Sequence, residues 1–415
     1  MIAILYSLLF VSLLYFYRRK NGNCVGTWLL LWYAIASLLT VWEYYTTPIN
    51  STYLDFTACV YYAACQILAL IPFLILGKYD CSRFLFNREL FRYLSFVLIL
   101  FGFIKLATSV TELYRNIGIL FGNIEEIRYA FYDSLLESQN KSAFDKLMII
   151  INNFQFMSPF LAFYFLCKGE GKMALCLFIA SLGMPVGQMT HGEREGALKY
   201  IVNLYFCYKF FSPSLTEVVR NRVKKLGVQI LTPFIIFIVA MTLGRFAGAG
   251  NRGVTNSLFL YGGDQPFFFT TLFNDQNIIS QIQGGRVNFQ YFFPAIERVQ
   301  GQINMYINSD LYLNQFGGLP GSMFLDFGYY AIVVIGLFSL MYYTIIRKAI
   351  KKSMYLPLHI TFLFYFSFQV LYMNIYYFDF CSLFSILFSL VFFIVCYFYK
   401  GNDKLQARNL NIINK

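Results

Sequence analysis

The chain has 415 residues, of which 58% are hydrophobic and only 13% are charged, and its formal net charge is +12. A soluble protein carries about twice that share of charged residues, so the composition excludes a soluble multidomain protein. The apolar residues occur in blocks close to the ~20 residues that a helix needs to cross a bilayer. We therefore expect a single helical bundle embedded in a membrane.

Taken in chain order, these blocks predict an all-α integral membrane protein with about eleven transmembrane helices. The predicted spans cover residues 2–17, 26–46, 56–76, 91–110, 148–167, 173–190, 197–211, 226–243, 322–346, 356–373 and 378–399. Three parts follow from this reading. A transmembrane bundle at 1–243 precedes a large outer loop at 244–321, and the last three spans with a short tail occupy 322–415.

Lysine and arginine cluster in alternate connections, after every odd-numbered span from the first to the eleventh. Loops on the cytoplasmic side of a membrane carry an excess of these residues. The alternation predicts that the N-terminus lies outside and the C-terminus inside. Because the basic residues follow the topology, we interpret the net charge as a membrane signal and expect no nucleic-acid partner.

Two predicted outer segments are long. Residues 111–147 mix charged and apolar residues, which indicates either amphipathic helices on the bilayer surface or a solvated cap. The 244–321 loop is rich in Asn and Gln and carries aromatic runs at Phe267–Phe269 and Tyr291–Phe293. Amides and aromatic faces suit a carbohydrate. The alternative is an interfacial loop whose aromatic rings sit at the level of the lipid headgroups.

Arginine favours an anionic substrate at this loop. Arg245 and Arg252 flank the end of the eighth span, and Arg286 follows two glycines. A guanidinium matches a phosphate with a planar fork of donors, and glycine lets the backbone approach an anion. We therefore predict that these three arginines bind a lipid-linked pyrophosphate. The alternative is that each one reaches the phosphates of ordinary membrane lipids.

The densest polar cluster, residues 190–199, connects the sixth and seventh spans. It supplies four candidate catalytic residues, His191, Glu193, Arg194 and Glu195. An imidazole beside carboxylates can act as a general base, and either glutamate is an alternative base. A helix that begins at Gly192 would place the histidine, the arginine and the second glutamate on one face. The glycines of this cluster would let a neighbouring helix come close, although a purely structural turn also fits.

Four further ionisable residues lie near predicted outer span ends: Glu43, Lys105, Asp326 and Asp379. Charges at membrane depth usually face a cavity or each other, so this placement predicts a polar chamber open to the outside. The cysteines fall mostly in apolar blocks, where cysteine behaves as a small apolar residue. Because no Cys or His spacing resembles a metal site, we expect neither a metal nor a cofactor.

Three stretches resemble the Wzy-type O-antigen polymerases, also called oligosaccharide repeat-unit polymerases. These are His191–Leu198, Leu260–Asp264 with Asn274 downstream, and Asn314–Gly328, which contains Asp326-Phe-Gly. The first stretch departs from the family pattern by carrying His-Gly-Glu before its arginine. The third contains an extra Gly-Gly-Leu-Pro-Gly run.

The resemblance implies a GT-C-type bundle with a large periplasmic loop, in the bacterial cytoplasmic (inner) membrane. It implies a metal-independent glycosyltransferase that joins repeat units linked to undecaprenyl pyrophosphate into O-antigen or capsular polysaccharide. Arginines would stabilise the leaving pyrophosphate, a base would deprotonate the acceptor hydroxyl, and Asp264 and Asp326 would bind substrate. Membrane lipids, a chain-length regulator and a flippase are the further partners that the resemblance implies.

Two other functions fit the same pattern. An O-antigen ligase uses the same lipid donor but transfers the polymer to lipid A-core. A flippase or other transporter belongs to a different class and is expected to show internal repeats and helices broken near the midplane. Neither repeats nor a midplane relay is evident in this sequence, and its loops are strongly asymmetric.

Overall fold

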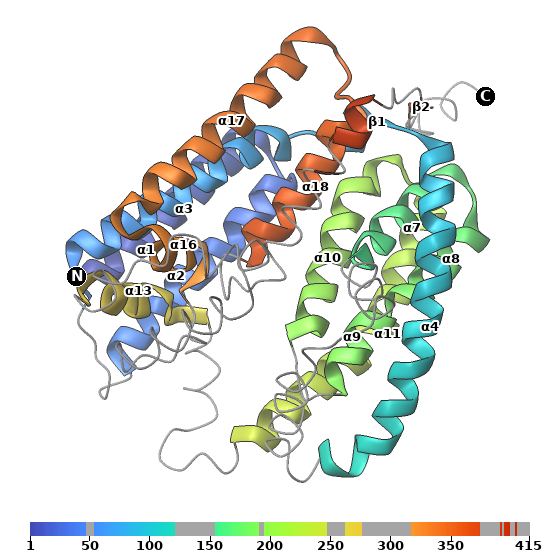
Figure 1. The fold of residues 1–415 in the computed structure, drawn as a ribbon, viewed down its shortest axis with the longest axis horizontal. Helices are drawn as coiled ribbons and strands as arrows, with labels where there is room; N and C mark the ends of the chain where they lie inside the picture. The colour runs from blue at the N-terminus through green and yellow to red at the C-terminus, as the bar shows by residue number, and fades with distance from the viewer. Residues whose placement is uncertain are drawn as a thin grey trace, which may run out of the picture. The chain divides into compact units, whose positions relative to one another are not determined.

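The protein is almost entirely helical where its structure is described (Figure 1). The computed structural model describes residues 1–46, 54–120, 154–190, 195–246, 262–275, 317–373, 391, 394–398 and 403–404. The chain divides into two compact units. Unit 1 joins Met1–Tyr79 to Thr255–Lys400, and unit 2 joins Asp80–Val254 to Gly401–Lys415.

Unit 1 is built on three long apolar helices joined to a C-terminal helical pair. Its described helices are α1 (Ile2–Asn21), α2 (Val25–Thr46), α3 (Phe56–Gly77), α13 (Gln265–Asn274), α16 (Gly318–Phe327), η5 (Gly328–Tyr330), α17 (Ala331–Lys352) and α18 (Leu358–Met373). The turn between α1 and α2 needs Gly22, whose φ of 71° suits a residue without a side chain. α1 packs mainly on α2, and α17 packs along α3.

The short helices α13 and α16 lie at one end of unit 1, where α1 begins, α2 ends and α3 begins (Figure 1). Phe267 of α13 stacks on Tyr44 near the end of α2, with ring centroids 6.4 Å apart. Phe269 contacts Tyr61 and Tyr62 in the first turns of α3. The basic residues that close α1 and α17 are at the other ends of those helices.

Unit 2 contains α4 (Arg88–Leu120), α7 (Met157–Lys168), α8 (Gly171–Ser181), α9 (Gly183–Met189), α10 (Glu195–Phe211) and α11 (Glu217–Phe246). Short 3₁₀ turns, η1 (Cys81–Arg83) and η3 (Ser212–Ser214), flank a two-stranded antiparallel pair of β1 (Leu85–Phe86) and β2 (Asp403–Lys404). Beside this pair the core is aromatic. Phe86, Phe160 and Phe211 are fully buried, and their rings contact one another.

Glycines let α8 and α9 pack closely on α4. A β-carbon at Gly183 would lie 2.9 Å from the carbonyl oxygen of Gly102, and one at Gly102 would lie 2.7 Å from the β-carbon of Ala180. Both distances are below ordinary van der Waals contact, so larger residues would force the helices apart. The glycines of the sixth predicted span therefore divide it into α8 and α9 and also hold α9 against α4.

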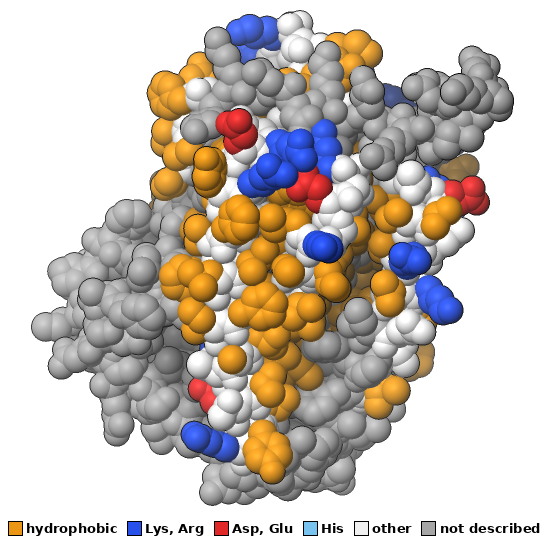
Figure 2. Space-filling view, turned by 90° about the vertical axis from the view of Figure 1, so that its right-hand side faces the viewer, with side chains coloured by type: hydrophobic (Ala, Val, Ile, Leu, Met, Phe, Trp, Pro, Cys, Tyr) orange, Lys and Arg blue, Asp and Glu red, His pale blue; other side chains and the backbone are white. Residues whose placement is uncertain are grey.

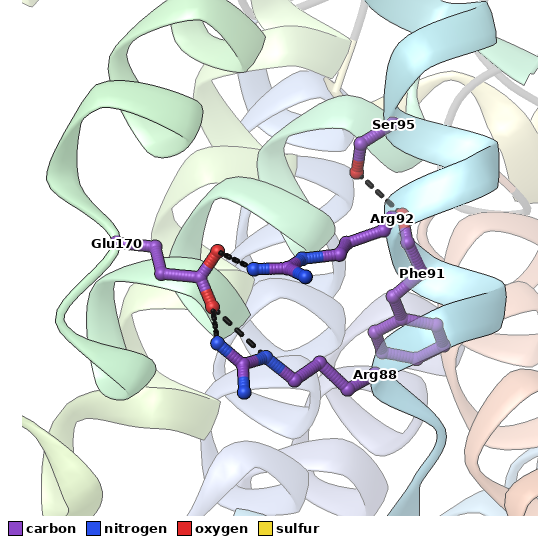
Figure 3. A network of polar contacts seen from close by, with 5 residues as sticks. All are labelled: Arg88, Phe91, Arg92, Ser95 and Glu170. Atoms are coloured by element: carbon purple, nitrogen blue, oxygen red, sulfur yellow. Dashed lines mark hydrogen bonds and ion pairs between the residues drawn. The ribbon is translucent and has the colours of Figure 1, made fainter.

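The opposite end of α4 is fixed by an ion-pair network (Figure 3). The Glu170 carboxylate, between α7 and α8, accepts hydrogen bonds from Arg88 at 2.5 and 3.0 Å and from Arg92 at 3.2 Å. Partial burial tends to raise the pKa of Glu170, but the hydrogen bonds and charges of the two arginines outweigh it and hold that pKa below its ordinary value. These arginines belong to one of the basic clusters that were predicted to lie on the inner side.

The described helices support a membrane-embedded protein. Within the described residues, six helical segments are long and apolar enough to cross a membrane: Ile2–Asn21, Val25–Thr46, Phe56–Gly77, Arg88–Arg115, Gly171–Met189 and Gly318–Lys352. Met157–Lys168 and Leu358–Tyr372 are shorter apolar helices. The predicted spans at 197–211 and 226–243 fall within α10 and α11, and most of 378–399 lies outside the described residues. The all-α membrane character is thus confirmed, and the number eleven stays a prediction.

The surface agrees with this character. Large apolar side chains are exposed along α4 and α8, including Tyr93, Phe96, Leu100 and Leu175. Figure 2 shows an apolar band on one face, with lysine and arginine side chains gathered mainly toward one end of it. An exposed apolar band of this kind suits contact with lipid rather than with water.

Two predicted boundaries differ from the structure. The ninth span, predicted at 322–346, is preceded by helix from Gly318 and broken at Gly328, whose backbone (φ 54°, ψ −136°) cannot continue a helix. Asp326-Phe-Gly328 therefore ends a short helix instead of beginning a long one. The fourth span, predicted to end at residue 110, continues as helix to Leu120, into the segment predicted as amphipathic.

Candidate functional site

The structure describes part of the predicted site. His191, Glu193, Arg194, Arg252 and Arg286 lie outside the described residues. Glu195 begins α10 and Arg245 is the penultimate residue of α11, and for both only the backbone is described. Asp264 and Asp326 are described in full, as are Glu43 and Lys105 of the predicted polar chamber, whereas Asp379 is not.

Glu43 is buried near the end of α2. Its side chain is only 7% exposed, and its Oε2 has no hydrogen-bond partner among the residues that the structure describes. Asp264 lies close enough for its negative charge to act on Glu43. Asp264 is half-buried and precedes α13 as its N-cap residue. Two carboxyl groups from distant parts of the sequence therefore lie near each other at this end of unit 1.

Two glycines bring Asp264 to α2. A β-carbon at Gly263 would lie 2.6 Å from the carbonyl carbon of Leu39 and 2.8 Å from the amide nitrogen of Thr40. A β-carbon at Gly262 would collide with the Leu39 side chain. The Thr40 hydroxyl donates a hydrogen bond of 2.9 Å to the Gly263 carbonyl oxygen. These contacts hold Gly262-Gly263-Asp264, part of a stretch that resembles one of the polymerase family, against the C-terminal part of α2.

Asp326 is fully buried in α16. Its helix packs against α13 and the first turns of α3, beside the cluster of Tyr61, Phe269 and Phe324. Asp326 and Asp264 thus lie on two short helices that contact each other in unit 1. The structure places both aspartates at the end of unit 1 that also holds Glu43.

The aromatic run Phe267–Phe269 differs from both sequence-based alternatives. Its three side chains are 8%, 5% and 0% exposed, and their rings pack on aromatic residues of α2, α3 and α16. They neither present faces to a sugar nor lie exposed at headgroup level. The reason is that Gln265–Asn274 forms a helix buried against α3 and α16, so its aromatic residues form core. The run at Tyr291–Phe293 lies outside the described residues.

In unit 2, the Lys105 side chain lies against Gly187, where α9 packs on α4. A β-carbon at Gly187 would lie 2.9 Å from Cε and 3.3 Å from Nζ of Lys105, and 2.9 Å from Oγ of Ser109. Thr190, which follows α9, is fully buried and donates its hydroxyl to the Gly187 carbonyl oxygen at 2.6 Å. The ammonium group of Lys105 therefore lies near the start of the 190–199 polar cluster.

Glycine also matters at the beginning of α10, as the sequence predicted. The Gln188 side chain occupies the place that a β-carbon at Gly196 would take, so α9 and α10 approach closely there. The buried Oε1 of Gln188 has no hydrogen-bond partner among the described residues. The prediction that His191, Arg194 and Glu195 share a helix face lies outside the described side chains.

The candidate residues divide between the units. Glu43, Asp264 and Asp326 belong to unit 1, and Lys105, Glu195 and Arg245 belong to unit 2. Within the described residues, no group of three or more His, Cys, Asp and Glu side chains is arranged to hold a metal ion, and every cysteine there is free. The sequence singled out most of these positions, but it gave no sign that Glu43 and Asp264 are neighbours.

No known protein family model, curated protein or solved structure matches this chain.

Proposed function

We propose that this chain is a membrane glycosyltransferase that polymerises undecaprenyl-pyrophosphate-linked repeat units into O-antigen or capsular polysaccharide on the outer face of the bacterial cytoplasmic membrane. One observation carries the proposal. In unit 1, Glu43, Asp264 and Asp326 lie at the end remote from the basic residues that close α1 and α17. In unit 2, Lys105 lies where α4 packs against α9. Ionisable side chains at membrane depth mark substrate sites more often than structural ones.

The reaction needs cationic side chains that bind the pyrophosphate of the lipid-linked substrate. It also needs hydrogen-bond acceptors that bind the hydroxyl groups of the sugar. An acceptor hydroxyl attacks the anomeric carbon of the growing chain, a new C–O bond forms, and the C–O bond to the pyrophosphate breaks. The departing pyrophosphate needs charge stabilisation, which guanidinium and ammonium groups provide. Arg194, Arg245, Arg252 and Arg286 are the proposed guanidinium donors, and the proposed base is His191, Glu193 or Glu195.

Turnover by the purified protein tests the reaction class. The full chain is placed in vesicles with lipid-linked repeat units already facing the outer side. We expect longer chains to form and undecaprenyl pyrophosphate to be released. A protein that only moves such units across the bilayer would release none, and that result would overturn the proposal in favour of a flippase.

Lipids from a deletion strain separate polymerase from ligase. Loss of a polymerase leaves a single repeat unit attached to the lipid A-core, whereas loss of a ligase leaves polymer that is not attached to it. We expect the first pattern. Unattached polymer in the deletion strain would instead assign this chain as the ligase.

Arginine substitutions test the proposed phosphate contacts. Arg194→Ala and Arg245→Ala are each expected to abolish polymer while the protein still inserts. Arg222→Ala is a matched control, because Arg222 is an exposed basic residue near the opposite end of the same helix as Arg245. Long chains in both test variants would refute the arginine assignment.

A further inference from the structure

The side chain of Lys105 follows the contact between α4 and α9. A β-carbon at Gly183 would lie 3.3 Å from the Lys105 β-carbon, and one at Gly187 would lie 2.9 Å from its Cε and 3.3 Å from its Nζ. Gly187 comes four residues after Gly183, which is about 6 Å further along α9. The lysine therefore extends toward the C-terminal end of α9, where the polar cluster at 190–199 begins.

This direction is opposite to the one that a helical side chain ordinarily takes. α4 and α9 run parallel, because Gly102 lies against Gly183 and the later residue Ser109 lies against Gly187. Side chains of an α-helix lean toward its N-terminus, whereas that of Lys105 extends toward the C-terminal end of α4. Lysines near the end of a membrane span extend in this way to bring the ammonium to the level of the lipid head groups.

The position of Lys105 along α4 agrees with this level. The helix begins at Arg88, in a cluster of basic residues that was predicted to lie on the inner side. Lys105 is about 25 Å further along the helix axis, and the hydrocarbon core of a bilayer is about 30 Å thick. In the proposed orientation, the extended side chain therefore brings its ammonium close to the outer head groups.

The ammonium has no charged partner among the residues that the structure describes. The ion pairs found there join Arg88 and Arg92 to Glu170. The next carboxyl group on α4 after Lys105 is that of Glu112, about 10 Å further along the helix. Lys105 is only half-buried, and its Nζ is not among the fully buried polar atoms that lack a partner. An anion from outside the described part of the chain can therefore reach it.

A phosphate group suits this ammonium. An ammonium has three hydrogen-bond donors and no acceptor, and lysine is a common phosphate ligand in proteins. A cation at this depth is unfavourable unless it meets a negative charge, and phosphates are the anions that lipids carry at head-group level. Glycine at 187 leaves the room that the end of the lysine occupies, because a larger side chain there would collide with Cε.

The chain beyond α9 supplies a second cation. Thr190 is fixed by its hydrogen bond to the Gly187 carbonyl oxygen, and Arg194 follows four residues later. Four residues of chain span at most about 14 Å, so Arg194 stays within that distance of Thr190. Two cations suit a pyrophosphate, which carries more negative charge than the phosphodiester of an ordinary phospholipid.

We infer that Lys105, held beside Gly187, binds a phosphate group of a lipid head group in the outer leaflet. That this lipid is the undecaprenyl-pyrophosphate-linked donor rests on the proposed function, whereas the phosphate site itself does not. With the donor bound, the Lys105 ammonium donates hydrogen bonds to pyrophosphate oxygens and stabilises the charge that develops as the pyrophosphate departs. Lys105 transfers no proton and forms no covalent bond.

Lipid binding by the full-length protein tests the site. The protein is purified in maltoside detergent, which contains no phosphate, and its affinities for undecaprenyl pyrophosphate, phosphatidylglycerol and uncharged undecaprenol are measured. Lys105→Met removes the charge at nearly constant length, and Lys105→Arg keeps the charge. Lys172→Met is the matched control, because Lys172 is an exposed lysine in the first turn of α8 in the same unit.

We expect Lys105→Met to weaken the binding of undecaprenyl pyrophosphate at least about tenfold, because a hydrogen bond between charged groups is lost. Lys105→Arg should keep most of the affinity, and Lys172→Met should keep all of it. Binding of undecaprenol should be weak and equal in all of these proteins. Methionine is apolar, so Lys105→Met should insert and should unfold at no lower temperature than wild type.

Two outcomes would overturn the inference in whole or in part. Unchanged affinity of Lys105→Met for both charged lipids refutes the site. A lower unfolding temperature of that variant would then show that the ammonium pairs with a carboxyl group of the chain instead. Affinity that depends on Lys105 equally for phosphatidylglycerol and for undecaprenyl pyrophosphate keeps the phosphate site but refutes its assignment to the donor.

Polymer formation in vesicles separates the site from the reaction. If the donor assignment is correct, Lys105→Met raises the KM for lipid-linked units and Lys105→Arg restores it. A wild type that binds undecaprenyl pyrophosphate through Lys105 but forms no polymer supports the site and refutes the polymerase. Polymer formation and lipid binding at wild-type levels in Lys105→Met refute the site alone. A wild type that neither binds the charged lipids nor forms polymer refutes both.

Discussion

The two units position ionisable side chains in similar ways, but the side chains are of opposite kinds, acidic in unit 1 and basic in unit 2. In unit 1, two glycines let a loop contact the backbone of α2 and bring Asp264 to the buried Glu43. In unit 2, glycines let α9 lie against α4, and Lys105 extends across Gly187. Close packing at glycine positions each charge in both units. The positioned groups of unit 1 are carboxyl groups, whereas the positioned group of unit 2 is an ammonium group.

The surroundings of the charges also differ. The carboxyl groups of unit 1 lie beside a helix whose phenylalanines are all core residues, so their setting is rigid and apolar. Lys105 is only half-buried, and its ammonium lies at the end of a flexible side chain. We therefore expect substitutions in unit 1 to cost more stability than comparable substitutions in unit 2.

The largest effect is expected for Phe269→Ala in α13. Its ring is fully buried, and its centroid lies 5.0 Å from that of the Tyr62 ring and 5.5 Å from that of the Phe324 ring. Truncation to alanine therefore leaves a cavity. The free energy of unfolding should fall by about 3 kcal/mol, measured by thermal unfolding in detergent. Oligosaccharide affinity in the remaining folded protein should not change. A stable variant that has lost sugar binding would instead restore the sugar-stacking interpretation of this aromatic run.

Gly263→Ala should have the next largest effect. The new β-carbon would lie 2.6 Å from the backbone of Leu39, and backbone cannot move aside as a side-chain tip can. We expect a loss of about 2–3 kcal/mol in unfolding free energy. Gly171→Ala is the control, since nothing lies within 4 Å of its β-carbon position. Equal stability of the two variants would show that the contact with α2 is not tight.

Gly187→Ala tests the close packing of α9 on α4 in unit 2, and it should lower the free energy of unfolding by less than Gly263→Ala does. The new methyl group would meet the end of the Lys105 side chain and the Ser109 hydroxyl, both of which can rotate. We expect a loss of about 1 kcal/mol and weaker binding of undecaprenyl pyrophosphate, because the ammonium group is displaced. Gly227→Ala, in open space on α11, is the control. A loss of stability as large as that of Gly263→Ala would remove the difference between the units.

The smallest effect is expected at the ion pairs of Glu170. Because the folded-state pKa of Glu170 lies below its ordinary value of 4.5, the pairs stabilise the protein above that pH and are lost as pH falls below it. Glu170→Gln should lower the unfolding free energy at pH 7 by at most about 1 kcal/mol, since both arginines are about half exposed. The difference from wild type should vanish at acidic pH, as thermal unfolding across pH 3–7 would show. A difference that stays constant with pH would mean that the ion pairs contribute nothing.

The sequence predicted the long helices well, and the reason is physical. The spans predicted at 26–46 and 56–76 correspond to helices at Val25–Thr46 and Phe56–Gly77, because a bilayer imposes both the length and the apolar composition. The same rule cannot separate a span from a short buried helix beside it. For that reason the sequence analysis did not predict that the helix ends at Gly328. It also assigned the phenylalanines of α13 to the outer loop.

The site was predicted less completely. Asp264 and Asp326 were identified through short stretches that resemble a family, and Glu43 through its depth in a span. The approach of Asp264 to Glu43 depends on a contact between residues more than two hundred positions apart, and no local pattern encodes it.

The length of α4 has a consequence for the route by which a lipid-linked substrate arrives. Gly187 of α9 lies against Lys105 and Ser109 of α4, and α4 continues as helix beyond Ser109 to Leu120. Those eleven further residues extend about 16 Å past the contact, at 1.5 Å per residue. In the proposed orientation this extension projects beyond the α9 terminus on the outer side. Under the proposed function, the head group of a lipid-linked substrate that reaches the α9 terminus would therefore arrive from a side that α4 does not occupy.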